Sequence, residues 1–336
     1  MILFFITFIS TLALAFLLVK IPLAIAAPSD RGMHEISIST SGGLAILVSI
    51  SMSSIFLNID IYFLLLLSFI SLIGLLDDIY NISKLIRIIS QLILPIVLLY
   101  NFPIEFSGNT MVIYFLVIIA MTYLVNAFNF MDGIDTIVVN ESIFILLSIY
   151  ILSLNSIVID SNIENIILLS LFSILGFGIL NLSPAKIFLG NIGSYLIGFI
   201  MSYLYYMIIS SSIDYLFPLT ILLSVFIVET LFTITRRFYL KFISLMSNKN
   251  ISLIEILSIS LAHITEAHCT HNYQILAKKL KSHSAVNVII LLYNILWSFP
   301  LAYMSLMIPG YSVIIVIISF LPYIYWCYYN EKKVNE

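Results

Sequence analysis

Long apolar runs, separated by short polar segments, dominate this 336-residue sequence. Hydrophobic residues make up 62% of the chain and charged residues only 9%, whereas a soluble domain carries about 25% charged residues. A helix that crosses a membrane needs about 20 apolar residues in succession, and continuous aliphatic runs favour helices over a β-barrel. We expect an all-α, polytopic integral membrane protein that forms one domain over 1–336, with about eleven transmembrane helices: 2–25, 42–58, 60–76, 86–101, 111–128, 142–158, 165–181, 190–210, 215–234, 285–305 and 311–328.

Lysine and arginine residues occupy alternate connections between these runs. Because basic residues accumulate on the cytoplasmic side of a membrane, their distribution predicts an outside N-terminus and a cytoplasmic C-terminus. The segment 251–264 is apolar but too short to span, so we expect an interfacial or re-entrant segment within a cytoplasmic loop over 236–284. The connections near 58, 105, 160, 212 and 308 contain neither residue type, and the others contain Arg31, Lys84, Arg87, Lys186, Arg236, Arg237, Lys241, Lys249, Lys278, Lys279 and Lys281.

In this orientation the polar clusters fall on the cytoplasmic side. A transporter exposes polar groups to both sides and usually buries some near the middle of the membrane. The one-sided layout therefore favours an enzyme with a soluble substrate over a secondary transporter, which is the alternative class. The net charge of −3 says little about partners, and we expect no nucleic-acid partner. Cys269 and Cys327 form no metal or disulfide spacing.

Asp77 and Asp78 follow the apolar run FISLIGLL. Adjacent carboxylates repel each other, and placing both at a membrane boundary costs free energy unless a cation or a proton compensates. The pair suits metal-phosphate chemistry, or a base beside the group that orients it. The alternative is a solvated helix end, where Asp is poorly placed with respect to the macrodipole.

The stretch NAFNFMDGIDT closes another apolar run. Asn126, Asn129 and Asp132 would share one face if the helix continues, and such a row of oxygen ligands suits a hard cation. Gly133 permits a tight turn near a phosphate. The alternative is a polar cap, because Asn, Asp and Gly are ordinary turn residues, but a turn does not require so many, with Asp135 among them.

In NLSPAKIFLGNIGS, Pro184 is expected to open a span and Lys186 adds a positive charge. The run from Gly190 to Ser194 could present backbone amides to phosphate oxygens at a helix N-terminus. Close helix packing through small residues is an equal alternative.

His268 and His271 in EAHCTHNYQ would share one helical face. Zinc is disfavoured because further ligands at the right spacing are missing. Near a cluster of lysines, the pair suits recognition of a pyrophosphate, and the alternative is a basic interfacial patch that binds anionic headgroups. No role is assigned to His34, His263 or His283.

Together these segments resemble the polyprenyl-phosphate N-acetylhexosamine-1-phosphate transferases, which are glycosyltransferase family 4 and relatives of the phospho-N-acetylmuramoyl-pentapeptide translocase. The motifs that carry the resemblance lie between about Pro28 and His283 and follow the family's order: GLLDDIYNISKLIRIISQ, NAFNFMDGIDT, NLSPAKIFLGNIGSYLIG, FIVETLFTITRR and EAHCTHNYQILAKKLKSH. The last two resemble the subgroup that initiates O-antigen synthesis.

The resemblance implies a Mg²⁺-dependent enzyme (Mn²⁺ is an alternative) of the bacterial inner membrane, with the active site toward the cytoplasm. Its partners would be undecaprenyl phosphate, a UDP-sugar, the lipid bilayer and, in some assemblies, a second copy of the chain. The lipid phosphate would attack the UDP-sugar and release UMP. The roles it implies are catalytic for Asp77, Asp78, His268 and His271, nucleotide or phosphate binding for Asn126, Asp135, Arg87 and Lys186, and metal binding for Asn129, Asp132 and Asn191.

Four positions depart from the family's pattern. Asn191 replaces an aspartate expected at the metal, Thr136 replaces the glycine after Asp135, Cys269 replaces an arginine, and Thr40 stands where an arginine commonly precedes two glycines. These departures leave a second interpretation open, a weakened relative that binds lipid phosphate or a partner without turnover.

Overall fold

The computed structural model describes residues 1–26, 37–104, 110–156, 159–246, 251–264 and 270–335, and this part of the chain is almost entirely helical. The exception is a short antiparallel pair, in which β1 (Ile25–Ala26) pairs with β2 (Ile38–Ser39). The helices are α1 (Ile2–Lys20), α2 (Gly42–Leu57), α3 (Ile61–Tyr80), α4 (Lys84–Asn101), α5 (Thr110–Met131), α6 (Ile137–Ser156), α7 (Ser161–Asn181), α8 (Gly190–Ser211), η1 (Ile213–Tyr215), α9 (Leu216–Leu222), α10 (Ser224–Met246), α11 (Leu253–Ile264), α12 (Asn272–Leu280), α13 (His283–Tyr293), the π-helix η2 (Asn294–Ser298), α14 (Phe299–Met307), η3 (Pro309–Tyr311) and α15 (Ser312–Asn335).

Nine helical segments of the described chain are long and apolar enough to cross a membrane, and α9 with α10, which meet at a bend of 68°, make a tenth span if counted together. The all-α, polytopic fold is confirmed, and each of the eleven predicted runs corresponds to helix. The predicted count is not reached because α2 has only 16 residues. At 1.5 Å per residue it is about 24 Å long, shorter than a hydrocarbon core of about 30 Å. The segment predicted to be interfacial forms α11, and its position at the interface stays a prediction.

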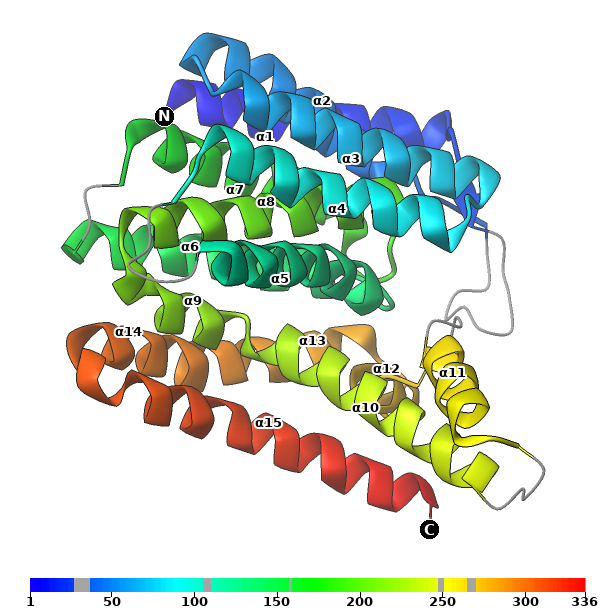
Figure 1. Ribbon diagram of the computed structural model, residues 1–336. Helices are drawn as coiled ribbons and strands as arrows, with labels where there is room; N and C mark the ends of the chain where they lie inside the picture. Colours follow the sequence, from blue (N-terminus) through cyan, green and yellow to red (C-terminus); the bar gives the residue numbers. More distant parts are fainter. Residues whose placement is uncertain (27–36, 105–109, 157–158, 247–250, 265–269, 336) are drawn as a thin grey trace.

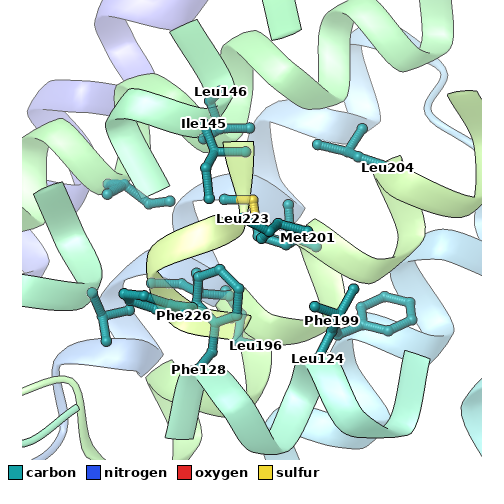
Figure 2. Packing of buried hydrophobic residues seen from close by; sticks show 14 of the residues in the cluster. Leu124, Phe128, Ile145, Leu146, Leu196, Phe199, Met201, Leu204, Leu223 and Phe226 are labelled. Atoms are coloured by element: carbon teal, nitrogen blue, oxygen red, sulfur yellow. The ribbon is translucent and has the colours of Figure 1, made fainter. Parts of the chain in front are cut away.

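Helix α8 lies in the middle of the bundle and packs against α3 and α5. In Figure 1, α1, α2 and α3 lie on one side, and α9, α10, α13, α14 and α15 lie on the other. Figure 2 shows one contact in the core, where the rings of Phe128 from α5 and Phe226 from α10 are tilted at 60° to each other with a centroid distance of 4.8 Å. Leu196 and Phe199 from α8 are also fully buried. A helix that is apolar on all sides lies either in a protein core or against lipid, and the burial of α8 places it in the core of the bundle.

Glycines allow the backbone of α8 to approach its neighbours closely. A Cβ atom added to Gly43 of α2 would lie 2.2 Å from the backbone nitrogen of Gly193, and one added to Gly74 of α3 would lie 2.6 Å from the backbone of Ile192. Both distances are far below van der Waals contact, so no other residue fits without moving a helix. Small residues are the usual means of close helix contact in membranes, and this interpretation of the glycine-rich run is confirmed.

We expect Gly43→Ala to lower the stability of the purified protein by about 1–3 kcal/mol, because the added methyl group overpacks a backbone contact. Gly310→Ala is the matched control, because a Cβ atom there meets nothing within 4 Å. Thermal unfolding in detergent measures both variants. Equal melting temperatures for the two variants would contradict the close contact.

Candidate active site

A pocket of about 390 Å³ opens where several helices end. Asp78 comes from the last turn of α3, Asn129 from the last turn of α5 and Asn191 from the first turn of α8. Sequence segments far apart in the chain therefore meet at one end of the bundle. The lining residues are Thr40, Asp78, Asn129, Asp132, Gly133, Ile134, Asp135, Asn181, Phe188, Gly190, Asn191, Gln274 and His283.

The Asp78 carboxylate binds the N-terminus of α8. Its Oδ1 accepts a hydrogen bond from the backbone N–H of Asn191 at 3.0 Å, and its Oδ2 accepts one from Ile192 at 3.2 Å. Free N–H groups and the positive end of the helix macrodipole both favour a carboxylate there. The expectation that these amides are available to a phosphate is therefore wrong for Asn191 and Ile192. Pro184 does not open the helix either, because α8 begins at Gly190.

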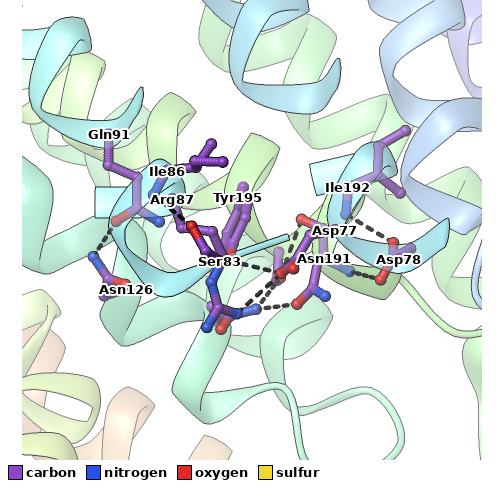
Figure 3. A network of polar contacts seen from close by, with 12 residues as sticks. Asp77, Asp78, Ser83, Ile86, Arg87, Gln91, Asn126, Asn191, Ile192 and Tyr195 are labelled. Atoms are coloured by element: carbon purple, nitrogen blue, oxygen red, sulfur yellow. Dashed lines mark hydrogen bonds and ion pairs between the residues drawn. The ribbon is translucent and has the colours of Figure 1, made fainter. Parts of the chain in front are cut away.

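Asp77 faces a different environment from its neighbour. Its Oδ2 atom lies 3.0 Å from Nη1 of Arg87, and it accepts a hydrogen bond from the Tyr195 hydroxyl at 3.3 Å (Figure 3). Asp77 is buried and does not line the pocket. The two adjacent carboxylates thus have separate partners, which reduces the repulsion that the sequence alone suggests.

Asn129 links α5 to α8. Its Nδ2 atom donates to Oδ1 of Asn191 at 2.8 Å and to the hydroxyl of Ser194 at 2.9 Å. Helix α5 ends at Met131, so Asp132 lies just beyond the helix and does not continue its face as the spacing predicted. Asn126 donates to Oε1 of Gln91 at 2.6 Å and does not line this pocket.

The turn over residues 132–136 brings Asp132 and Asp135 into the pocket wall. Burial raises the pKa of Asp132 to about 7, and the charges of Asp78 and Asp135 add to this rise. Burial also acts to raise the pKa of Asp135, but hydrogen bonds from His283, Ser183 and Ala185 bring it below its ordinary value. Two carboxylates three residues apart therefore differ in how readily they ionise.

His283, to which the sequence assigned no role, lies beside Asp135. Its Nδ1 atom is 3.1 Å from Oδ2 of Asp135 and 3.3 Å from the backbone nitrogen of the same residue. Its only sequence signal is its place at the start of a predicted span, which does not distinguish it from a helix cap. The pocket also takes in Gln274, which sequence reasoning missed as well.

The two predicted histidines have different outcomes. His268 lies outside the described residues. His271 is buried at the N-terminus of α12, where its Nδ1 atom is 3.7 Å from Oε1 of Glu229, and it does not line the pocket. Lys186 is exposed and is also absent from the lining.

Glu229 is completely buried and holds α12 against α10 and α15. It accepts hydrogen bonds from the backbone N–H of Asn272 at 2.5 Å and from the Tyr323 hydroxyl at 2.9 Å, and Sγ of Cys327 lies 3.7 Å away. This attachment sets the position of Gln274, two residues after Asn272.

A second cavity of about 180 Å³ adjoins the first, and Asn129 lines both. Its wall combines apolar side chains with two basic ones. The lining residues are Lys84, Arg87, Ile88, Asn126, Asn129, Phe130, Tyr195, Ile234 and Ile264.

No group of three His, Cys, Asp or Glu side chains in the described part of the chain is arranged to hold a metal ion. Most of the donor groups that line the pocket are carboxylate and amide oxygens, beside the Thr40 hydroxyl and the His283 imidazole, and no lysine or arginine is among the described lining residues. Oxygen donors of this kind fit a hard divalent cation that also keeps water or substrate ligands.

Residues 61–209 match the family model described as Glycosyl transferase family 4. A Bacillus subtilis protein described as a probable undecaprenyl-phosphate N-acetylglucosaminyl 1-phosphate transferase is 29% identical over 237 residues, which is 64% of this chain and 64% of that protein. An undecaprenyl-phosphate alpha-N-acetylglucosaminyl 1-phosphate transferase of Thermotoga maritima is 32% identical over 52% of this chain and 54% of its own length. The matched part of the chain thus covers somewhat under two thirds of the length of the Bacillus subtilis protein and about half of the length of the Thermotoga maritima protein.

We expect Asn191→Asp to make the protein more dependent on divalent cations. The new carboxylate would lie beside Asp78, and the repulsion should cost about 1 kcal/mol or more until a cation offsets it. Thermal unfolding should show a lower melting temperature than wild type in EDTA and a larger rise on adding Mg²⁺.

Asn162→Asp is the control, because it adds the same charge at the opposite end of α7 from the pocket residue Asn181. If Asn191→Asp and wild type respond equally to Mg²⁺, position 191 does not adjoin a cation site.

Proposed function

Because this chain belongs to glycosyl transferase family 4, we propose that it transfers a sugar 1-phosphate from a UDP-sugar to undecaprenyl phosphate and releases UMP. The relatives' names support N-acetylglucosamine 1-phosphate or a related N-acetylhexosamine 1-phosphate as the transferred group. An oxygen of the lipid phosphate would form a bond to the β-phosphorus, and the bond from that phosphorus to the bridging oxygen would break. UMP would leave with the electrons of that bond.

The observation that carries the proposal is the charge of the main pocket. Three carboxylates line it, and no lysine or arginine does so among the described residues. An anionic diphosphate would enter such a pocket only with cations. The proposal therefore includes Mg²⁺, or alternatively Mn²⁺, held by Asp132, Asn129 and Asn191. When bound, the ion would neutralise the diphosphate and stabilise the leaving UMP.

The second cavity suits the acceptor lipid. Arg87 and Lys84 provide positive charge for a phosphate monoester, while Phe130, Ile234 and Ile264 provide an apolar wall for the first part of a prenyl chain. Asp77 fixes the guanidinium of Arg87 through its 3.0 Å contact, so its proposed role is to orient the phosphate-binding group. The lipid phosphate and the diphosphate would meet at Asn129, which lines both cavities.

Asp78 is proposed to hold the reacting groups in place rather than to attack the substrate. Both of its carboxylate oxygens accept backbone hydrogen bonds from α8, and a nucleophilic attack would break at least one of them. A lipid phosphate has a second pKa near 6 and is largely a dianion at neutral pH. It therefore has little need of a base to remove its proton.

The proposed orientation rests on the basic residues. Lys84 and Arg87 line the second cavity from the start of α4, and Lys281 directly follows α12; such residues accumulate on the cytoplasmic side. We therefore propose that the pocket faces the cytoplasm from the bacterial inner membrane. The O-antigen pathway and a homodimer stay predictions from the resemblance.

Purified protein should release UMP from UDP-N-acetylglucosamine when undecaprenyl phosphate and Mg²⁺ are present, and EDTA should stop the reaction. Asp132→Asn should lower the rate roughly 100-fold or more, because the proposed cation and the diphosphate lose a charged partner. Glu164→Gln, in the first turn of α7 and far from the pocket, is the control. Full activity of Asp132→Asn would contradict the proposed site. No UMP release by the wild type with any UDP-N-acetylhexosamine would favour the relative without turnover, to which Asn191 points.

Arg87→Gln should raise the KM for undecaprenyl phosphate about tenfold, because one charge-assisted hydrogen bond is lost. The KM for the UDP-sugar should change little, since Arg87 lines only the second cavity. Initial rates with each substrate varied in turn measure both constants, with Lys241→Gln on α10 as the control. A selective rise in the KM for the UDP-sugar would reverse the assignment of the two cavities.

A further inference from the structure

Thr136 adopts a backbone conformation that β-branched residues rarely adopt. Its φ angle is +62°, in the left-handed region that glycine enters freely and other residues avoid. The residue directly follows Asp135 and immediately precedes α6, which begins at Ile137. A backbone of this kind persists only where its surroundings hold it in place.

Two buried asparagines from other helices hold Thr136. Asn181, the last residue of α7, accepts a hydrogen bond from the backbone N–H of Thr136 at 2.9 Å. Asn287 of α13 donates from Nδ2 to the backbone carbonyl of Asp135 at 2.7 Å and to the hydroxyl of Thr136 at 2.9 Å. Both asparagines are at least 95% buried, so water does not compete for these bonds.

The contacts of Asn287 and His283 lie on one face of α13. The two residues are four apart, which places them one above the other on a helix. His283 contacts the side chain and the backbone nitrogen of Asp135, while Asn287 contacts the carbonyl of Asp135 and the hydroxyl of Thr136. One face of α13 therefore contacts both the backbone and the side chains of Asp135 and Thr136. Helix α13 lies outside the segment 61–209 that matches the family.

We propose that Asn287 is a positioning residue for the reaction, which acts by holding Thr136 at positive φ and thereby fixes Asp135 and Asp132 in the main pocket. Asn181 supplies the second attachment, and its Nδ2 atom also donates to the carbonyl of Ile187 at 2.8 Å in the loop that leads to α8. The turn and the N-terminus of α8 are thus set relative to each other through one side chain. The catalytic part of this inference rests on the proposed function.

A different interpretation is that Asn287 only satisfies buried polar groups. The two interpretations differ in what a glycine at position 136 would do. Glycine adopts positive φ without strain, so the turn would keep its shape with less help from Asn287. Thr136→Gly also removes the hydroxyl that accepts a hydrogen bond from Asn287, so the comparison needs Thr136→Val, which lacks the hydroxyl but keeps a β-branched side chain at positive φ. If Asn287 merely satisfies polar groups, its loss would cost the same in the Thr136→Val and Thr136→Gly backgrounds.

The test combines Asn287→Ala with Thr136→Val and with Thr136→Gly, and each single and combined variant is assayed by UMP release. In the Thr136→Val background, Asn287→Ala should lower kcat/KM for the UDP-sugar by at least about tenfold, and in the Thr136→Gly background by less than about threefold. The KM for undecaprenyl phosphate should be unchanged, because the turn does not line the second cavity. A general loss of folded protein would lower the maximal rate and leave the KM for the UDP-sugar unchanged.

Asn294→Ala is the matched control, because Asn294 is also buried and donates to Glu141 at 2.6 Å, away from the turn. It should show no coupling to Thr136→Gly. Equal losses from Asn287→Ala in both backgrounds would overturn the proposal. Asn287→Ser provides a second variant if the alanine protein does not fold.

Thermal unfolding of the same variants separates this inference from the proposed function. If the wild type releases no UMP, the proposed function fails, but the coupling between positions 136 and 287 is still measured as a shift in melting temperature. The shift caused by Asn287→Ala in the Thr136→Gly background should be at most half of the shift in the Thr136→Val background. Equal shifts in the two backgrounds would show that Asn287 does not hold the backbone at position 136, whatever reaction the protein catalyses.

Discussion

The carboxylate of Asp78 at the N-terminus of α8 is the contact on which the pocket depends. It joins the last turn of α3 to the first turn of a helix that is enclosed on all sides, and it satisfies two backbone N–H groups that would otherwise lack partners. With α8 fixed there, the side chain of Asn191 meets Asn129 of α5. Amide and carboxylate oxygens from three helices consequently converge although no sequence segment contains them all.

The C-terminal third of the chain completes this arrangement from the opposite side. Glu229 fixes the start of α12 and so places Gln274, while α13 places His283 against Asp135. Gly133 allows this approach, because a Cβ atom there would lie 2.4 Å from both the Gln274 amide and the Tyr273 hydroxyl. The pocket therefore has one wall inside the family-matched segment 61–209 and another wall outside it.

The sequence predicted the helices and the convergence of polar clusters well, because apolar length and the charge of connections are local properties. Asp78, Asn129, Asp132 and Asn191 do meet at one pocket, as their motifs indicated. The sequence could not predict which of Asp77 and Asp78 lines the pocket. The rotation of α3 about its own axis, relative to α8, decides which of the two carboxylates faces it. His283 lines the pocket and His271 does not, which is the reverse of what the sequence predicted. The positions of α12 and α13 depend on contacts with Glu229 and Asp135, and neither contact produces a periodic pattern in the sequence.

The glycines between α8 and its neighbours have a consequence for how the protein tolerates change. The atoms nearest to a Cβ added at Gly43 or Gly74 belong to the backbone of α8, and each position leaves no room for a single methyl group beside the helix that carries Asn191. A random-mutation screen that scored only lost activity would find these positions as intolerant as Asp78 or Asp132. Intolerance at this end of the bundle therefore reports how closely the backbones pack as much as which atoms meet a substrate, and the two are separated by measuring stability beside activity.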